Sequence, residues 1–259
     1  MKKFNKYVLP LLLIALMAFV STCKKDKNET PSFQNLAFND EEIIDRIPAA
    51  MAASSDENAQ ACVDAIESAA DWSSFYSNLT PPSNATKVAT KSTNSEGTWK
   101  WSWNYDGTHV MTLYWTYSET STKHIWEMDI QFGDGAHYDY IDAWELKDGT
   151  QGEIKYNFAW ICAYEPDYYE DCTDLFWVIT WNKNASGVIN YTFLWQSDDP
   201  EYAYYLKYEI VSNPDGSGTL DYYYLGDYWH YHYEWDILGN GTWVWYMSGD
   251  LYMSGSWEV

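Results

Sequence analysis

Apolar and polar residues alternate with a period of two from Gly97 to the C-terminus. At residues 99–105 Trp and Tyr alternate with Lys, Ser and Asn, and similar runs follow at 126–132, 154–160, 189–195, 202–210 and 229–235. Such a period is typical of β-strands that turn one face to a core and the other to water. Between the runs lie Asp-Gly or Asn-Gly pairs, which favour hairpin turns, at 106–107, 134–135, 148–149, 215–216 and 240–241.

Residues 97–259 are therefore predicted to form one mainly β domain of about twelve strands, joined mostly by short turns. No helical crossover separates the strands, so we predict antiparallel pairing in up-and-down order. A long, strongly twisted antiparallel sheet tends to curl, and we expect a β-barrel or half-barrel that is apolar inside and polar outside. In architecture only, this fold resembles lipocalin-like and lipoprotein-carrier folds. A membrane-spanning barrel would instead turn its apolar face to lipid, but the sequence shows no consistent set of longer loops on one side.

A helical pattern precedes the β domain, over residues 39–82. Asn39 and Glu42 predict a capping box that opens one helix, and Ser55 predicts the cap of a second. Small and apolar residues recur at helical spacing along the second helix, at Ala59, Cys62, Val63, Ile66, Ala69 and Ala70. We expect this segment to pack on or in the sheet, with residues 56–78 as a plug or lid, and residues 83–96 to form a polar linker.

Three lysines and an apolar run from Tyr7 to Val20 predict a signal peptide over residues 1–22. The run ends in Val20-Ser21-Thr22-Cys23, which resembles the lipobox of bacterial lipoproteins of the Bacteroidota type. That resemblance implies cleavage before Cys23 and a membrane anchor on the acylated Cys23. It supplies a location, an outer-membrane lipoprotein of the cell envelope, periplasmic or surface-exposed, but no activity. Residues 23–38 are polar and charged, and predict a flexible tether.

Charge narrows the range of partners. The formal net charge is -23, and the expected mature chain is more acidic still because Lys2, Lys3 and Lys6 leave with the signal peptide. Such a field repels nucleic acid and anionic lipid headgroups, so we expect no nucleic-acid partner. It suits solubility, cations or neutral ligands.

Cysteine use fits an exported protein, because the compartment outside the inner membrane is oxidising. Cys162 and Cys172 flank a loop that is long enough to close, and we predict a disulfide between them. Cys62 lies on the predicted helix face, where we expect it to act as a small buried apolar residue.

Aromatic residues make up 19% of the chain, with 16 Trp and 24 Tyr, which is more than a plain core needs. They fill a wide barrel, or they line a cavity for an apolar or ring-bearing ligand such as a lipid or a sugar. On the second hypothesis the ligand-binding residues are Trp101, Trp103, Trp126, Trp160, Trp195, Tyr231 and Trp235. Tyr205 and Tyr223, on the polar face, are candidates for an external platform on which sugars stack.

Metal chemistry has one candidate, because His230, His232 and Glu234 alternate on one face of a strand. A His-x-His pair holds a metal when a neighbouring strand supplies a third ligand. Exposed His and Glu on a polar face need no metal, so we predict no metal and keep these three residues as candidates. The acidic loop around Glu165 and Asp174 lacks the spacing of a calcium-binding EF-hand.

Motifs for catalysis are missing from the sequence, which has no nucleophile elbow, zinc-protease helix, P-loop or dinucleotide fingerprint. We therefore predict no catalytic residue and no cofactor. The favoured function is a non-enzymatic, lipid-anchored binding module for an apolar or carbohydrate ligand. The alternatives are a structural or interaction protein of the cell surface with a solid core, and an envelope hydrolase. A ligand cavity would separate the first of these from the second.

Overall fold

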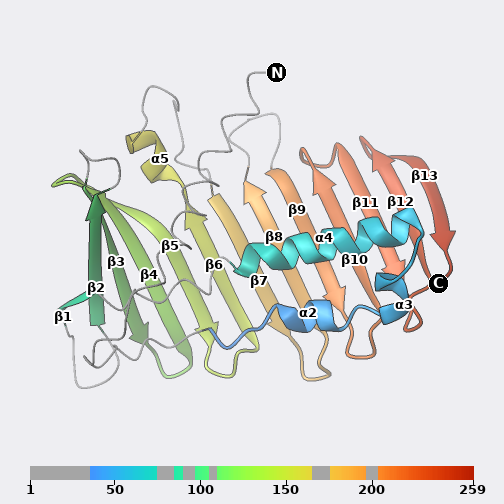
Figure 1. Ribbon diagram of the computed structural model, residues 1–259, viewed down its shortest axis with the longest axis horizontal. Helices are drawn as coiled ribbons and strands as arrows, with labels where there is room; N and C mark the ends of the chain where they lie inside the picture. The colour runs from blue at the N-terminus through green and yellow to red at the C-terminus, as the bar shows by residue number, and fades with distance from the viewer. Residues whose placement is uncertain (1–35, 75–84, 90–96, 105–109, 165–175, 197–203) are drawn as a thin grey trace.

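The computed structural model describes residues 36–74, 85–89, 97–104, 110–164, 176–196 and 204–259. In these ranges one sheet holds 13 strands, ordered β1 to β13, so that each strand pairs with its neighbours in sequence (Figure 1). All of the pairs are antiparallel. The predicted mainly β, up-and-down fold is therefore confirmed. Within the described residues the sheet is open, because β1 and β13 each pair on one side only.

The elements have the following bounds. The strands are β1 (Thr86–Ala89), β2 (Gly97–Asn104), β3 (Val110–Glu119), β4 (Lys123–Phe132), β5 (His137–Leu146), β6 (Gln151–Asn157), β7 (Phe176–Lys183), β8 (Ile189–Gln196), β9 (Tyr204–Ser212), β10 (Gly218–Tyr224), β11 (Trp229–Trp235), β12 (Gly241–Met247) and β13 (Asp250–Trp257). The helices are α2 (Glu41–Asp45), α3 (Ala49–Ala52), α4 (Glu57–Ser74) and α5 (Ala159–Tyr164).

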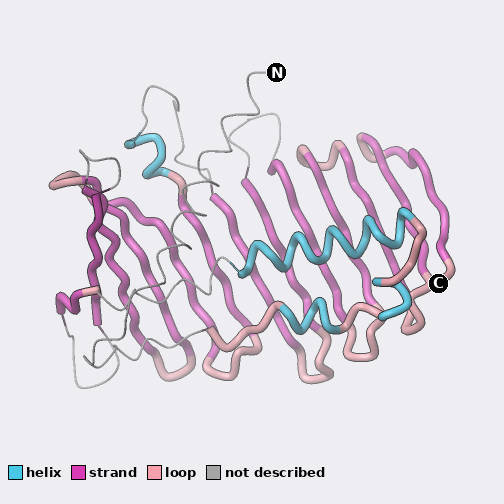
Figure 2. Tube along the Cα trace, in the orientation of Figure 1, coloured by secondary structure: helices cyan, strands magenta, loops and turns pink. Residues whose placement is uncertain are grey.

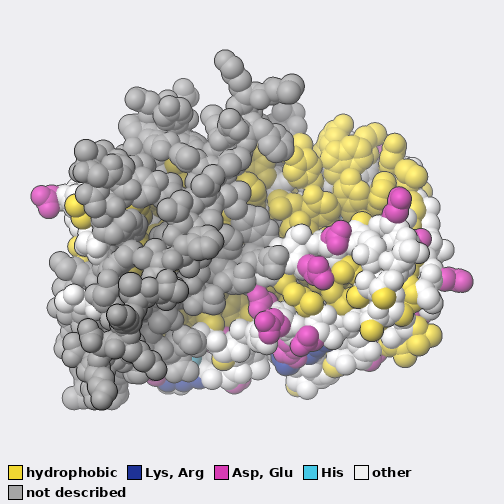
Figure 3. Space-filling model, viewed as in Figure 1, with side chains coloured by type: hydrophobic (Ala, Val, Ile, Leu, Met, Phe, Trp, Pro, Cys, Tyr) yellow, Lys and Arg dark blue, Asp and Glu magenta, His cyan; other side chains and the backbone are white. Residues whose placement is uncertain are grey.

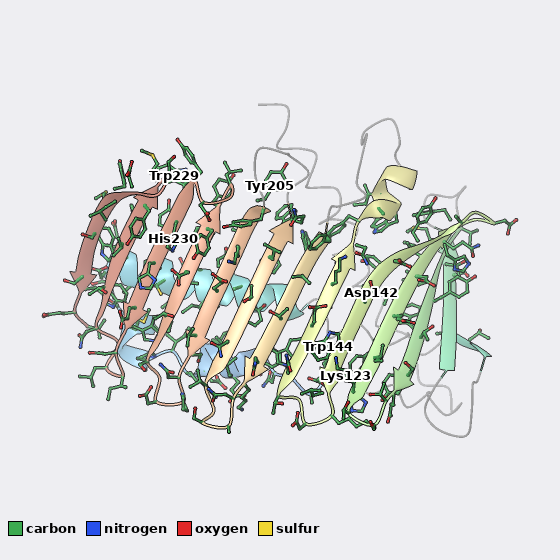
Figure 4. The ribbon with its side chains drawn as sticks, turned by 180° about the vertical axis from the view of Figure 1, so that it is seen from behind. Lys123, Asp142, Trp144, Tyr205, Trp229 and His230 are labelled. Atoms are coloured by element: carbon green, nitrogen blue, oxygen red, sulfur yellow. The ribbon has the colours of Figure 1, made fainter. Side chains whose placement is uncertain are left out.

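The two faces of the sheet differ in cover. Helices α2, α3 and α4 lie on one face, which we call the inner face, and α4 crosses several strands there (Figure 2). In β6, for example, the alternate side chains Ile154 and Tyr156 are buried on that face. The opposite, outer face carries the polar positions of the strands and faces the viewer in Figure 4. The sheet thus has one apolar and one polar face, as the alternation predicted.

Helix α4 packs on the sheet through its small-residue face. Its buried residues are those predicted from the spacing: Ala59, Cys62, Val63, Ile66, Ala69 and Ala70. The Tyr191 hydroxyl of β8 donates a hydrogen bond of 2.7 Å to the Ala69 carbonyl, so α4 and the sheet are joined by a buried polar contact as well. Among the described residues, no helix combines the length and apolar character that crossing a membrane requires.

The helix caps differ from the predicted ones. Asp40, not Asn39, is the N-cap of α2, and its carboxylate accepts from the Glu41 N–H. Glu42 does not complete a capping box, because its carboxylate binds Lys183 of β7 at 2.7 Å and pairs with Arg46. Ahead of α4, the Asp56 carboxylate accepts from the N–H groups at positions 58 and 59, the role predicted for Ser55. The Glu42 carboxylate therefore binds the Lys183 ammonium on the sheet, and not a backbone N–H at the start of α2, because charge-assisted hydrogen bonds are the stronger ones.

The end of the predicted tether is pinned to the sheet. The Ala37 and Phe38 N–H groups each donate to the Glu145 carboxylate at 2.8 Å, and the Phe38 ring stacks on Trp181 with centroids 4.6 Å apart. Glu145 is completely buried. Burial raises the pKa of its carboxyl against the lowering effect of the two N–H groups. Residues 36–38 therefore belong to the folded domain and not to a flexible tether.

A repeated pairing of glycine with tryptophan closes the lower ends of the strands in the view of Figure 1. In each case a strand glycine lies opposite a Trp on the next strand, and an added Cβ would meet the indole at 2.1, 2.5 and 2.2 Å; the pairs are Gly152–Trp181, Gly218–Trp235 and Gly241–Trp257. Each indole N–H donates to the carbonyl of a left-handed turn glycine, at Gly149, Gly216 and Gly239. Only glycine leaves room for the indole ring at these three strand positions. Each tryptophan can therefore reach the neighbouring turn and connect it to the core.

Two segments take a different structure from the one predicted. Thr86–Ala89 falls in the predicted linker but forms β1, which pairs with β2. The apolar run at 154–160 leaves the strand at Asn157, and Ala159–Tyr164 is helix α5. A short apolar run fits a buried helix as well as a strand, and periodicity alone does not separate them.

Candidate functional site

The predicted ligand-binding residues fall into three groups. Trp126, Trp160 and Trp235 are 2%, 2% and 5% exposed and belong to the packed core. Their burial supports the alternative in which these tryptophans fill the core and do not line a cavity. For Trp101 and Trp103 the structure describes the backbone, in β2, but their side chains lie outside the described part.

Trp195 and Tyr231, in contrast, lie in a part of the inner face that α4 does not cover. Two rows of residues run across β8 to β13 here, one at the ends of the strands and one two residues further in. The first row, in cross-strand register, is Trp195, Leu206, Tyr224, Trp229 and Met247. The second row continues from buried Tyr208 through Tyr222, Tyr231, Trp245 and Met253. We call the partly exposed members of both rows the open patch.

The open patch is apolar and uncharged. None of its nine side chains carries a charge, and hydrophobic side chains gather above α4 on this face in the space-filling view (Figure 3). Tyr224 and Met253 are exposed, and the other seven are partly buried. Glu57 and Asp64 of α4 are exposed, and acidic side chains lie beside the hydrophobic area in this view.

Ring geometry within the open patch is ordered. Tyr222 stacks on Tyr208 at a centroid distance of 4.9 Å and on Tyr231 at 5.4 Å. Tyr231 meets the Trp245 ring edge-on at 5.2 Å. Side chains stand roughly perpendicular to a sheet, so the stacked tyrosines hold their hydroxyls away from it. Burial raises the pKa of Tyr222 and of Tyr231, so both hydroxyls keep their protons at neutral pH and can donate hydrogen bonds.

The outer face carries a second cluster on the same strands. The Asp221 carboxylate of β10 hydrogen-bonds to the His230 Nε2 at 2.7 Å and to the His232 Nδ1 at 2.8 Å, both through the same oxygen. Asp221 is the direct cross-strand partner of His232. We call Asp221, His230 and His232 the carboxylate–histidine cluster; their side chains are 25%, 23% and 32% exposed. Figure 4 shows His230 on this face.

Electrostatics couple the three groups. Burial opposes ionisation of Asp221, but the hydrogen bonds and charges of the two histidines outweigh it and hold the pKa of that carboxyl well below its usual range. The hydrogen bond to Asp221 raises the pKa of His232, against the opposing effect of burial. Glu234, the third candidate from the sequence, pairs across the strands with Thr219 and Thr242 and is not a member of the cluster.

The two candidates for an external sugar platform, Tyr223 and Tyr205, both make ring contacts within the protein. Tyr223 stacks on His230 at 4.3 Å, and the Lys207 ammonium lies 4.9 Å from its ring centroid. Burial raises the pKa of Tyr223 to about 12. Tyr205 contacts Trp195 edge-on at 5.8 Å. Because its ring is already stacked on His230, Tyr223 is a poor external platform.

The cysteine predictions have separate outcomes. Cys62 is completely buried, and burial raises the pKa of its thiol, which fits an inert packing role. Cys162 lies in helix α5. Its side chain and the whole of Cys172 are outside the described residues, so their disulfide remains a prediction. Residues 1–35, with Cys23, are outside them too.

Comparisons with protein-family models, with curated proteins and with solved structures gave no match for this chain. The functional argument therefore depends on the open patch and on the carboxylate–histidine cluster themselves.

Proposed function

We propose that this chain is a non-enzymatic, lipid-anchored protein of the cell envelope that binds a neutral carbohydrate at the open patch. The observation that carries this proposal is the pair of cross-strand rows in which tryptophan and tyrosine remain partly exposed with no charge among them. The lipobox-like sequence ending at Cys23 supports the envelope address. Ligand sites commonly combine apolar walls with a few polar groups, and this patch has both.

Carbohydrate fits the open patch better than an alkyl lipid. An alkyl chain would cover the hydroxyls of Tyr222 and Tyr231 without giving them hydrogen-bond partners, which costs free energy. A sugar offers hydroxyls to these groups, and its apolar C–H faces suit the rings of Trp229 and Trp245. The high negative charge of the chain disfavours anionic ligands and leaves neutral ones unaffected.

One observation favours the alternative of a surface interaction protein. The edge strand β13 exposes Leu251 and Tyr252 next to Met253 of the open patch, and the backbone groups on its free edge have no strand partner in the described residues. Such an edge can accept a strand from another chain. A protein partner would then cover the patch and the edge together.

Titration of neutral oligosaccharides into the full-length chain in detergent, followed by tryptophan fluorescence and calorimetry, tests the proposal. We expect Trp229→Ala and Tyr231→Ala each to weaken binding about tenfold or more, as truncation of a central aromatic does. Tyr246→Ala is the matched control, because it removes a ring from β12 on the outer face.

Three outcomes would contradict the proposal. Binding that survives the double substitution of Trp229 and Tyr231 would place the sugar elsewhere. Uptake of apolar fluorescent probes but of no oligosaccharide would favour a lipid ligand. Concentration-dependent self-association that these substitutions abolish would favour the interaction protein.

A further inference from the structure

We propose that Asp221, His230 and His232 form a binding site for a divalent transition-metal ion, with Zn²⁺ as the reference ion. This site lies on the outer face, opposite the open patch, and does not depend on the carbohydrate proposal. Its three ligand atoms lie within 4.8 Å of one another.

The fold brings the three ligands together through strand register. His230 and His232 are two residues apart on β11, so both point to the outer face. Asp221 comes from β10 and stands directly opposite His232. Two ligands at about 2.0–2.1 Å from a tetrahedral zinc ion are about 3.3 Å apart. The present N···O distances of 2.7 and 2.8 Å therefore need to open by only about half an ångström to admit an ion.

The donor set selects the class of metal. Two imidazole nitrogens and one carboxylate suit Zn²⁺ and its transition-metal neighbours, whereas Ca²⁺ and Mg²⁺ prefer oxygen ligands alone. Three protein ligands leave a fourth position, and the partial exposure of all three side chains lets water fill it. The arrangement is thus an open metal site and not a closed structural one.

Neighbouring side chains hold the ligands in place. The His230 ring lies between Tyr223, with centroids 4.3 Å apart and planes 9° from parallel, and Tyr246, at 5.2 Å and 15°. This stack fixes the orientation of the imidazole before any ion arrives, and supporting contacts of this kind typically tune metal affinity.

Charge around the site also favours a cation. Glu209 of β9 stands opposite Asp221, and Glu234 adds a carboxylate on the same face two residues from His232. Lys207 is bound to Glu209 at 2.8 Å and offsets one of these charges. A bound divalent ion would offset the carboxylate charges that Lys207 leaves uncompensated.

A metal-free hydrogen-bond network is the competing explanation for the cluster, and the two differ in what they predict. The network stabilises the fold to the same extent with or without metal in the buffer. A metal site gives the full-length chain a saturable affinity for zinc and a melting temperature that depends on zinc.

The decisive experiment titrates zinc chloride into the full-length chain in competition with a chromophoric chelator, and measures thermal unfolding with zinc and with EDTA. We expect the wild-type chain to bind one zinc ion. Asp221→Asn and His232→Asn should each weaken the affinity for zinc about 100-fold, since loss of a residue that only supports a metal ligand already costs about 10–100-fold. His230→Phe should do the same while it keeps the ring stack with its two tyrosines. Glu234→Gln, on the same strand and face, is the control and should keep most of the affinity.

Tyr246→Leu adds a test of positioning, because it removes one ring of the stack but no ligand. We expect it to weaken zinc binding about tenfold. Absence of saturable zinc binding, or binding that the three ligand substitutions leave unchanged, would overturn the proposal. If Glu234→Gln and Asp221→Asn weakened zinc binding equally, the general negative charge of the outer face would explain the binding, and not a specific site.

Discussion

Strand β11 begins and ends with tryptophan on the same face, and the two residues have different surroundings. Trp235 is 5% exposed, lies against Gly218 and donates its N–H to the Gly216 carbonyl at 2.8 Å. Trp229 is partly exposed and contacts Tyr228 and Tyr252 edge-on, at 5.6 and 6.1 Å. Alternation along the strand places both on the inner face, but the helical segment covers only the end at Trp235. The same residue type therefore serves the core at one end of the strand and a surface at the other.

Replacing each of these tryptophans by alanine should give the largest difference. We expect Trp235→Ala to lower the free energy of unfolding by about 3–5 kcal/mol, because it leaves a cavity beside Gly218. Trp229→Ala should cost about 1 kcal/mol or less, because its site is already open to water. Urea unfolding followed by circular dichroism measures both. Equal losses would show that the upper end is packed as tightly as the lower one.

Removing the carboxylate of Glu145 should detach the chain that enters the helical cover. Glu145→Ala leaves the Ala37 and Phe38 N–H groups without their acceptor, at a cost of about 1–3 kcal/mol. Amide exchange at these two positions, measured by hydrogen–deuterium exchange, should increase while exchange at the open patch stays the same. If neither position exchanged faster, the segment would be held by its ring contacts alone.

The pH dependence of stability gives a separate check on Glu145. The fold raises the pKa of the Glu145 carboxyl above the ordinary 4.5. The contribution of Glu145 to stability is therefore full below about pH 4.5, and it is lost as the pH rises through the pKa of the folded state. The wild-type chain should therefore lose stability relative to Glu145→Gln between about pH 4.5 and pH 7. Parallel urea titrations at the two pH values measure this difference, and a constant difference would contradict it.

The smallest effect is expected at the turns on either side of β11. Leu225, in the turn beside the open patch, has a left-handed φ of 53°, a conformation that costs about 1 kcal/mol in a leucine. Leu225→Asn should stabilise the fold by up to about 1 kcal/mol, since asparagine tolerates this conformation. Leu238→Asn is the control, as Leu238 lies exposed in the lower turn without a positive φ. Thermal unfolding of the two variants measures the effect, and the same shift in both would rule out relief of strain.

Much of the fold of this protein can be predicted from local patterns in the sequence alone. The period of two set the face of each strand, the turn dipeptides gave the up-and-down order, and spacing gave the buried face of α4. Each of these depends on residues close together in the chain. At Asp148-Gly149 and Asp215-Gly216 the glycine is left-handed as such turns require, whereas near Asn240 the left-handed residue is Gly239.

Contacts between distant segments were decided only by the tertiary structure. Glu145 meets Ala37 across 108 positions, and Asp221 reaches His232 only in the register that β10 and β11 adopt. The alternation assigned Trp235 and Trp229 to one face without telling which end α2, α3 and α4 would cover. Period fixes which way a side chain points, because it follows from backbone geometry, whereas cover and register depend on how whole elements pack against each other.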